Sequence, residues 1–100
     1  MTKELTFIYL LRLVNAESPA KISPKEKTIV DEHFEYLKKC LAERKLFLAG
    51  RCLKGEFGVV IFHADCEKQA EDFVKNDPAI KKGVMTAELY PFRIALMERS

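Results

Sequence analysis

The sequence predicts an α+β fold in which four antiparallel strands form one sheet and two helices cover one of its faces. Three observations support this prediction. Apolar residues form four strand-like runs, two amphipathic stretches lie between them, and the order along the chain is β-α-β-β-α-β. A chain of 100 residues has the usual size of one domain, so we expect residues 1–100 to fold as a single domain.

The first strand is expected over residues 5–14, LTFIYLLRLV. Successive side chains of a strand point to opposite sides, and both alternating sets are apolar here. One set holds Leu5, Phe7, Tyr9, Leu11 and Leu13, and the other holds Ile8, Leu10 and Val14. A strand with one face in water alternates apolar with polar residues, so we expect this strand to be covered on both faces.

A polar loop over 15–23 leads to a helix expected over about 24–44. Ser23, Pro24 and Glu26 supply an N-cap, a proline at the first helical position and an acidic residue at the third. The positions that follow recur at the spacing of one helix face: Ile29, Val30, His33, Phe34, Leu37, Cys40 and Leu41. This face is expected to lie on the sheet.

A β-hairpin is expected after this helix. Residues 46–53 and 57–63 form its strands, and the glycine in the turn over 54–56 permits a tight connection. Asp65 is then expected to cap a second helix over about 66–76.

The rest of the chain supplies a short turn and the last strand. Asp77 and Pro78 start the turn and Gly83 ends it. The strand is expected over 85–97, where Pro91 interrupts it and so favours a sheet edge or a bulge. The completed order is that of the ferredoxin-like fold, with both helices on one face of the sheet.

The face of the sheet without helices would expose a large apolar surface. The strands expected over 5–14, 57–63 and 85–97 are apolar on both sides, and soluble monomers rarely expose so large a patch. A second copy packed sheet against sheet is the simplest cover, so we expect a homodimer through the sheet face. A different protein partner is the alternative.

Composition excludes several classes of function. The 17 Lys and Arg are interleaved with 15 Asp and Glu, which disfavours a nucleic-acid binder. Cys40, Cys52 and Cys66 form no C-x-x-C pair, so we expect no metal site and reduced thiols in a cytoplasmic protein. The apolar run over 7–14 is shorter than the ~20 residues that span a bilayer, and it lacks a signal-peptide pattern, so we expect no membrane association.

Two residues are candidates for proton transfer. His33 lies on the core-facing side of the first helix, where it is either a buried histidine bound to a backbone carbonyl or an acid–base group. Asp77 follows the second helix, whose end lies near the first half of the first helix in this fold. Its carboxylate would orient the imidazole for proton transfer, or it would only cap the turn that Pro78 begins.

Other polar residues have less support. Arg51 and Arg12 lie within strands and would bind an anionic substrate, or cover apolar surface with their stems. Tyr9 would hydrogen-bond a ligand from the sheet face, or belong to the core. His63 is favoured as a solvated or capping residue. Cys66 precedes the second helix, but no cysteine or histidine stands beside it for a thiol mechanism.

The chain resembles the YciI-like (YCII-related) domain proteins of the dimeric α/β-barrel group. The matching pieces are H-F-E-Y-L at 33–37, K-L-F-L-A-G at 45–50, N-D-P at 76–78, K-K-G-V at 81–84 and Y-P-F at 90–92. The resemblance implies a ferredoxin-like fold, dimerisation through the sheets and an active site built on a His-Asp pair, which falls on His33 and Asp77. Related families include muconolactone isomerases, and one YciI-like member is a chloromuconolactone dehalogenase. The family often has proline after A-G, where this chain has Arg51.

The leading hypothesis is a small lyase, isomerase or dehalogenase that acts on a carboxylated or lactone-like small molecule. His33 would remove a proton next to a carbonyl group, and Asp77 would fix its tautomer. This chemistry needs no cofactor. The alternative is a non-catalytic dimeric module that binds a small ligand or another protein.

Overall fold

The computed structural model describes residues 5–14, 23–54 and 57–98. Most of the predicted polar loop and residues 55–56 of the predicted turn lie outside these ranges. The strands are β1 (Leu5–Leu13), β2 (Leu46–Arg51), β3 (Gly58–Ala64) and β4 (Met85–Pro91), and the helices are α1 (Pro24–Ala42), α2 (Glu67–Lys75) and α3 (Pro78–Lys81).

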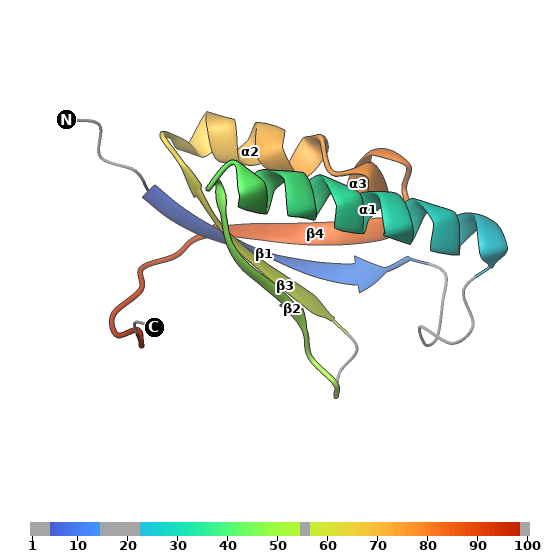
Figure 1. Ribbon diagram of the computed structural model, residues 1–100, viewed down its shortest axis with the longest axis horizontal. Coiled ribbons are helices and arrows are strands. Elements are labelled where there is room, and N and C mark those ends of the chain that lie inside the picture. The colour runs from blue at the N-terminus through green and yellow to red at the C-terminus, as the bar shows by residue number, and fades with distance from the viewer. Residues whose placement is uncertain (1–4, 15–22, 55–56, 99–100) are drawn as a thin grey trace.

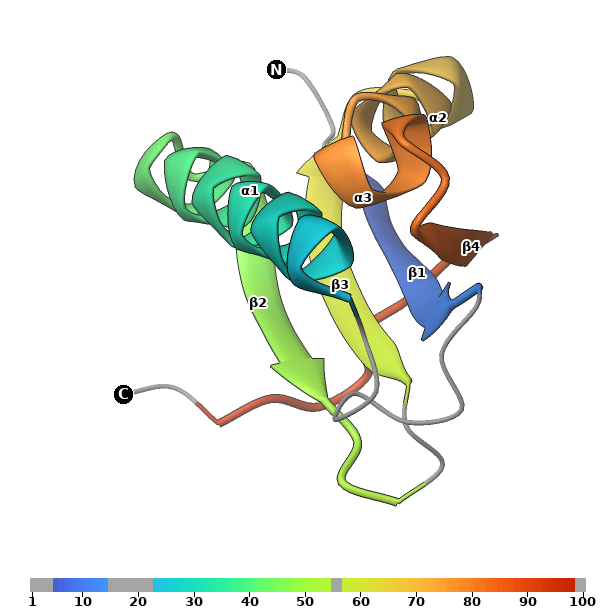
Figure 2. The same ribbon diagram turned by 90° about the vertical axis from the view of Figure 1, so that its right-hand side faces the viewer.

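The strands form one antiparallel sheet in the order β2-β3-β1-β4. All helices lie on one face of this sheet, with α1 over one half and α2 and α3 over the other (Figures 1 and 2). This arrangement confirms the predicted α+β, ferredoxin-like fold. The expected homodimer stays a prediction.

The start of α1 follows the predicted capping signals. The side chain of Ser23 accepts a hydrogen bond from the Glu26 N–H at 3.1 Å, and the Glu26 carboxylate accepts one from the Ser23 N–H at 3.0 Å. Pro24 occupies the first turn, where its missing N–H would have no partner inside the helix. The capping box therefore fixes the register of α1, and with it the face on which His33 lies.

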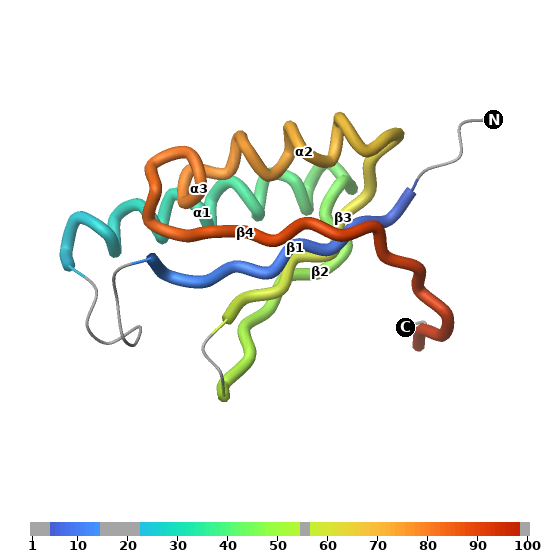
Figure 3. Tube along the Cα trace, turned by 180° about the vertical axis from the view of Figure 1, so that it is seen from behind, coloured from blue at the N-terminus to red at the C-terminus, as the bar shows by residue number. Residues whose placement is uncertain are grey.

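Two predictions at element ends are wrong. Asp65 does not cap α2: Cys66 is the N-cap residue and makes no side-chain capping bond, while the Asp65 N–H donates to the Gln69 side chain. The last strand ends at Pro91 rather than at residue 97. β4 is an edge strand, as Pro91 suggested, and after one further bond from the Phe92 N–H to the Thr6 carbonyl the tail leaves the sheet on the side away from the helices (Figure 3).

The core lies between the sheet and the helices. Phe7, Tyr9 and Leu11 of β1 point toward the helices and are at most 4% exposed. Ile8 and Leu10 alternate with these residues and so point to the other face, where they pair with Ile61 and Val59 of β3. None of the described helices covers this face (Figure 1). The apolar character of this second face is therefore as predicted.

Candidate functional site

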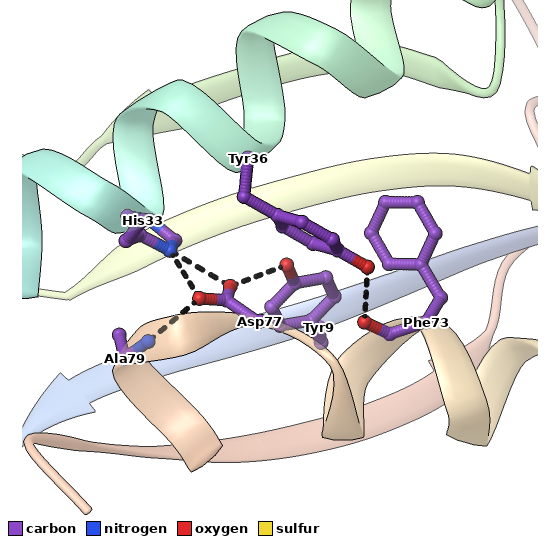
Figure 4. Close-up of polar contacts among 6 residues, drawn as sticks. All are labelled: Tyr9, His33, Tyr36, Phe73, Asp77 and Ala79. Carbon is purple, nitrogen blue, oxygen red and sulfur yellow. Dashed lines mark hydrogen bonds and ion pairs between the residues drawn. The ribbon is translucent and has the colours of Figure 1, made fainter. Parts of the chain in front are cut away.

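His33 and Asp77 meet in the interior of the molecule. His33 comes from the middle of α1 and Asp77 from the junction of α2 and α3, and their side chains point toward each other (Figure 4). The Nδ1 atom of His33 lies 2.7 Å from each oxygen of the Asp77 carboxylate. His33 is 7% exposed and Asp77 is completely buried.

The Asp77 carboxylate has two further donors. Its Oδ1 accepts a hydrogen bond from the Ala79 N–H at 3.0 Å, which is the N-cap bond of α3. Its Oδ2 accepts one from the hydroxyl of Tyr9 at 2.8 Å. A buried carboxylate is tolerated only when donors surround it, and these contacts meet that requirement. Asp77 is thus both the predicted cap and the predicted partner of His33.

This network assigns the proton on the imidazole. The carboxylate acts as an acceptor toward Nδ1, so the Nδ1–H of His33 donates to Asp77. The Nε2 atom of a neutral ring then carries a lone pair and can accept a proton. The pair therefore has the arrangement of a general base with its orienting carboxylate.

Tyr9 differs from its prediction as a ligand contact. The side chain is completely buried on the helix side of the sheet, and its hydroxyl already has Asp77 as its partner. Burial, and then the charge of Asp77, raise the pKa of Tyr9 far above its usual range, so the phenol stays protonated and donates. In this structure the side chain presents no exposed surface to a ligand.

A cavity of about 600 Å³ lies beside His33, between α1 and the strands. Its walls are mainly apolar and include Phe34, Leu37, Phe57 and Met85. The charged groups along it are Lys27, Asp31 and Arg51. This volume falls within the range of small-molecule sites, which are typically apolar with a few polar groups.

The structure brings only one of the two predicted arginines to this cavity. Arg51 lines it and forms no ion pair with any carboxylate in the described part of the chain. Arg12 instead pairs with Thr86 on the helix-free side of the sheet, and its guanidinium lies 4.9 Å from the centre of the Phe57 ring. Arg12 is therefore not among the residues that line this cavity, and its binding of an anionic substrate stays a prediction.

Two residues that the sequence analysis missed, Lys27 and Asp31, lie on the same helix as His33, α1. Lys27 and Asp31 lie one turn apart and line the cavity with Phe34. The spacing of three and four residues along α1 was the available signal. The bond from the Ala79 N–H is the one that the predicted cap at Asp77 implied.

The remaining candidate residues lie apart from the cavity. His63 pairs with Thr6 on the helix-free face, and its ring centre is 5.5 Å from that of Phe47. The three cysteines are free thiols. Within residues 5–14, 23–54 and 57–98, no group of three or more His, Cys, Asp or Glu side chains could hold a metal ion. None of the described helices is long and apolar enough to cross a membrane.

Comparisons with solved structures show proteins of the same fold. A 5-chloro-2-hydroxyhydroquinone dehydrochlorinase from Burkholderia phenoliruptrix AC1100, in complex with 2,5-dihydroxybenzoquinone, has 18% identity and a TM-score of 0.64, over 89% of this chain and 94% of that one. A muconolactone isomerase has 14% identity and a TM-score of 0.70, over 96% and 97%. SnoaB, a cofactor-independent oxygenase from Streptomyces nogalater, has 13% identity and a TM-score of 0.51, over 94% and 95%.

Sequence comparison identifies the family. No significant match was found among curated proteins. The YCII-related domain, in contrast, matches residues 9–93, which include β1 from Tyr9 onward, His33, Asp77 and β4. The chain therefore belongs to the YCII-related domain family.

Proposed function

We propose that this protein is an enzyme of the lyase, isomerase or dehalogenating type that acts on a small carboxylated or lactone-like molecule. The observation that carries the proposal is the bond from the His33 Nδ1 to Asp77 at 2.7 Å, beside a cavity that His33 lines. Nε2 of His33 removes a proton from a carbon next to a carbonyl group, and the released electron pair forms an enolate. The enolate is then protonated at another carbon or expels a halide ion.

The charges along the cavity favour an anionic substrate. The lining holds two cations, Arg51 and Lys27, and one acid, Asp31, and Arg51 forms no ion pair with a carboxylate in the described part of the chain. An arginine fork binds a carboxylate with two parallel hydrogen bonds, while the apolar walls accommodate a ring. Two solved structures of this fold are a dehydrochlorinase and a muconolactone isomerase, and both reaction types are among those proposed here.

His33→Gln is the variant that tests this function. Small lactones and halogenated acids are screened for turnover by the wild-type protein, and the variant is compared on any substrate found. The glutamine amide can still donate to Asp77 but cannot act as a base, so turnover should fall by about 10²–10⁴-fold. His63→Gln changes the other histidine, outside the cavity, and should retain full turnover. Undiminished turnover by His33→Gln would exclude His33 as the base.

A non-catalytic ligand-binding module is the second candidate, because the apolar cavity and Arg51 suffice for binding. Titration calorimetry with the same compounds, together with the turnover assay, distinguishes the enzyme from the binding module. A ligand that binds wild type and His33→Gln equally, and that neither converts, would favour the binding module.

We further propose that the protein is a cytoplasmic homodimer joined through the helix-free face of the sheet. Leu48 pairs with Ile61 on this face and is 46% exposed. Leu48→Asp should dissociate the dimer in sedimentation at micromolar concentration, whereas Leu53→Asp, in the exposed segment after β2, should not. A wild-type monomer of 11.5 kDa under these conditions would refute the dimer. The free cysteines fit a reducing compartment.

A further inference from the structure

We propose that Tyr9 is a positioning residue, whose hydroxyl fixes the Asp77 carboxylate so that His33 carries its proton on Nδ1 and presents a bare Nε2 to the cavity. This inference rests on the proposed function and extends it to a residue that touches neither substrate nor imidazole. Figure 4 shows the arrangement, with Tyr9 and His33 on opposite sides of the carboxylate.

The carboxylate is held at both oxygens. Oδ1 accepts from the Ala79 N–H at 3.0 Å and Oδ2 accepts from the Tyr9 hydroxyl at 2.8 Å, while His33 Nδ1 lies 2.7 Å from each. Rotation of the carboxylate would break at least one bond inside a region without water contact. Without Tyr9, Oδ2 would keep only its contact with His33 Nδ1, and the Ala79 N–H would be the one donor besides His33 that resists that rotation.

Tyr9 is built as a rigid donor. It lies in the middle of β1, with Val60 of β3 on one side and Leu89 of β4 on the other. Its ring makes edge contacts with Phe62 and Phe73, at centre distances of 5.7 and 6.1 Å. Burial keeps the phenol protonated, so its hydroxyl always donates to Asp77. The side chain therefore serves as a fixed support from the sheet.

Tyr36 provides a matched control. Its hydroxyl donates to the Phe73 carbonyl at 2.7 Å, and its ring contacts the ring of Phe73 at 5.5 Å. Tyr36 lies one turn after His33 on α1 but makes no hydrogen bond to Asp77. Tyr36→Phe thus removes a hydrogen bond of similar length from the same aromatic cluster and leaves the carboxylate intact.

The test measures the tautomer of His33 by ¹H–¹⁵N correlation through the carbon-bound protons of its ring. A His63→Gln background leaves His33 as the only histidine. The background protein should show a protonated Nδ1 and a bare Nε2. Tyr9→Phe should raise the share of the other tautomer by up to about fivefold, the limit set by the free energy of one hydrogen bond, whereas Tyr36→Phe should change nothing. On an identified substrate, Tyr9→Phe should lower kcat about fivefold with KM unchanged.

The outcomes separate this inference from the proposed function. A protonated Nδ1 that Tyr9→Phe leaves unchanged would overturn the role of Tyr9 alone. An equal change in Tyr36→Phe would also overturn it, because general loosening of the aromatic cluster would then be the cause. A proton on Nε2 in the background protein would overturn the proposed function and this inference together.

Discussion

Replacing Asp77 by asparagine tests the centre of the site with almost no change in shape. The carboxylate now accepts from His33, Tyr9 and Ala79. The asparagine side chain has one carbonyl oxygen and one NH₂ group, so one of the two positions changes from acceptor to donor. Asparagine caps helices as well as aspartate, so its oxygen is expected to keep the bond from Ala79.

The NH₂ group of asparagine would then face Tyr9 and the Nδ1 of His33. Nδ1 would then lie between this donor and the oxygen retained at the Oδ1 position, so the preference for a proton on Nδ1 weakens and the proton shifts toward Nε2, where a base is needed. One charge-assisted hydrogen bond is lost, which is worth about 1.5–3 kcal/mol, and relief of the buried charge offsets part of it. We therefore expect Asp77→Asn to lower the free energy of unfolding by about 2 kcal/mol, or about 10 °C in Tm for a chain of this size.

Thermal and urea unfolding measure the loss of stability, and turnover measures the effect of the changed tautomer. Asp72→Asn, on the exposed side of α2, is the matched control and should change stability by less than about 0.5 kcal/mol. Turnover by Asp77→Asn should fall by about 10²–10⁴-fold, because the remaining tautomer offers no base toward the cavity. Wild-type stability with wild-type turnover would refute both the charge-assisted bond and the tautomer assignment.

Two more predictions concern Arg51 and Tyr9. Arg51→Gln should raise KM for a carboxylated substrate at least tenfold and leave kcat within about twofold, because the lost ion pair holds the substrate equally before and during the reaction. An unchanged KM would show that Arg51 does not bind the substrate. The raised pKa of Tyr9 implies that the folded state keeps a proton that the unfolded state releases above pH about 10. Above that pH, Tyr9 should therefore lower the free energy of unfolding by about 1.4 kcal/mol per pH unit. In urea unfolding at a series of pH values, Tyr9→Phe should lack this contribution to the decrease.

Local signals predicted the position of His33. The capping box at Ser23 and the apolar spacing after it fixed both the start of α1 and the buried face, so the depth of His33 followed. The nearness of Asp77 followed from the order of elements alone. Tyr9 was harder, because its hydroxyl partner is 68 residues away and depends on how close α3 lies to β1. No local pattern encodes that distance.

The two arginines show how a single irregularity changes a prediction. Arg12 directly follows Leu11, which points toward the helices. Because successive side chains of a strand point to opposite faces, Arg12 points away from the helices. Arg51 lies an odd number of residues from Leu46, and the same rule would direct it away from the cavity. The ladder between β2 and β3 shifts register between Leu46 and Leu48, which returns Arg51 to the helix side opposite Gly58. A bulge of this kind has no clear sequence signature.

The two interpretations of Asp77, as a helix cap and as the partner of His33, prove compatible because the carboxylate has enough lone pairs for both. Each oxygen accepts from His33 and from one further donor, and the capping donor uses Oδ1 only. Capping is therefore no argument against a role in proton transfer, and the two contributions can be measured apart. Asp77→Ala removes cap and partner together, whereas Asp77→Asn retains the cap, so the two variants should differ in unfolding free energy by about 1 kcal/mol from the cap bond while sharing the same loss of turnover.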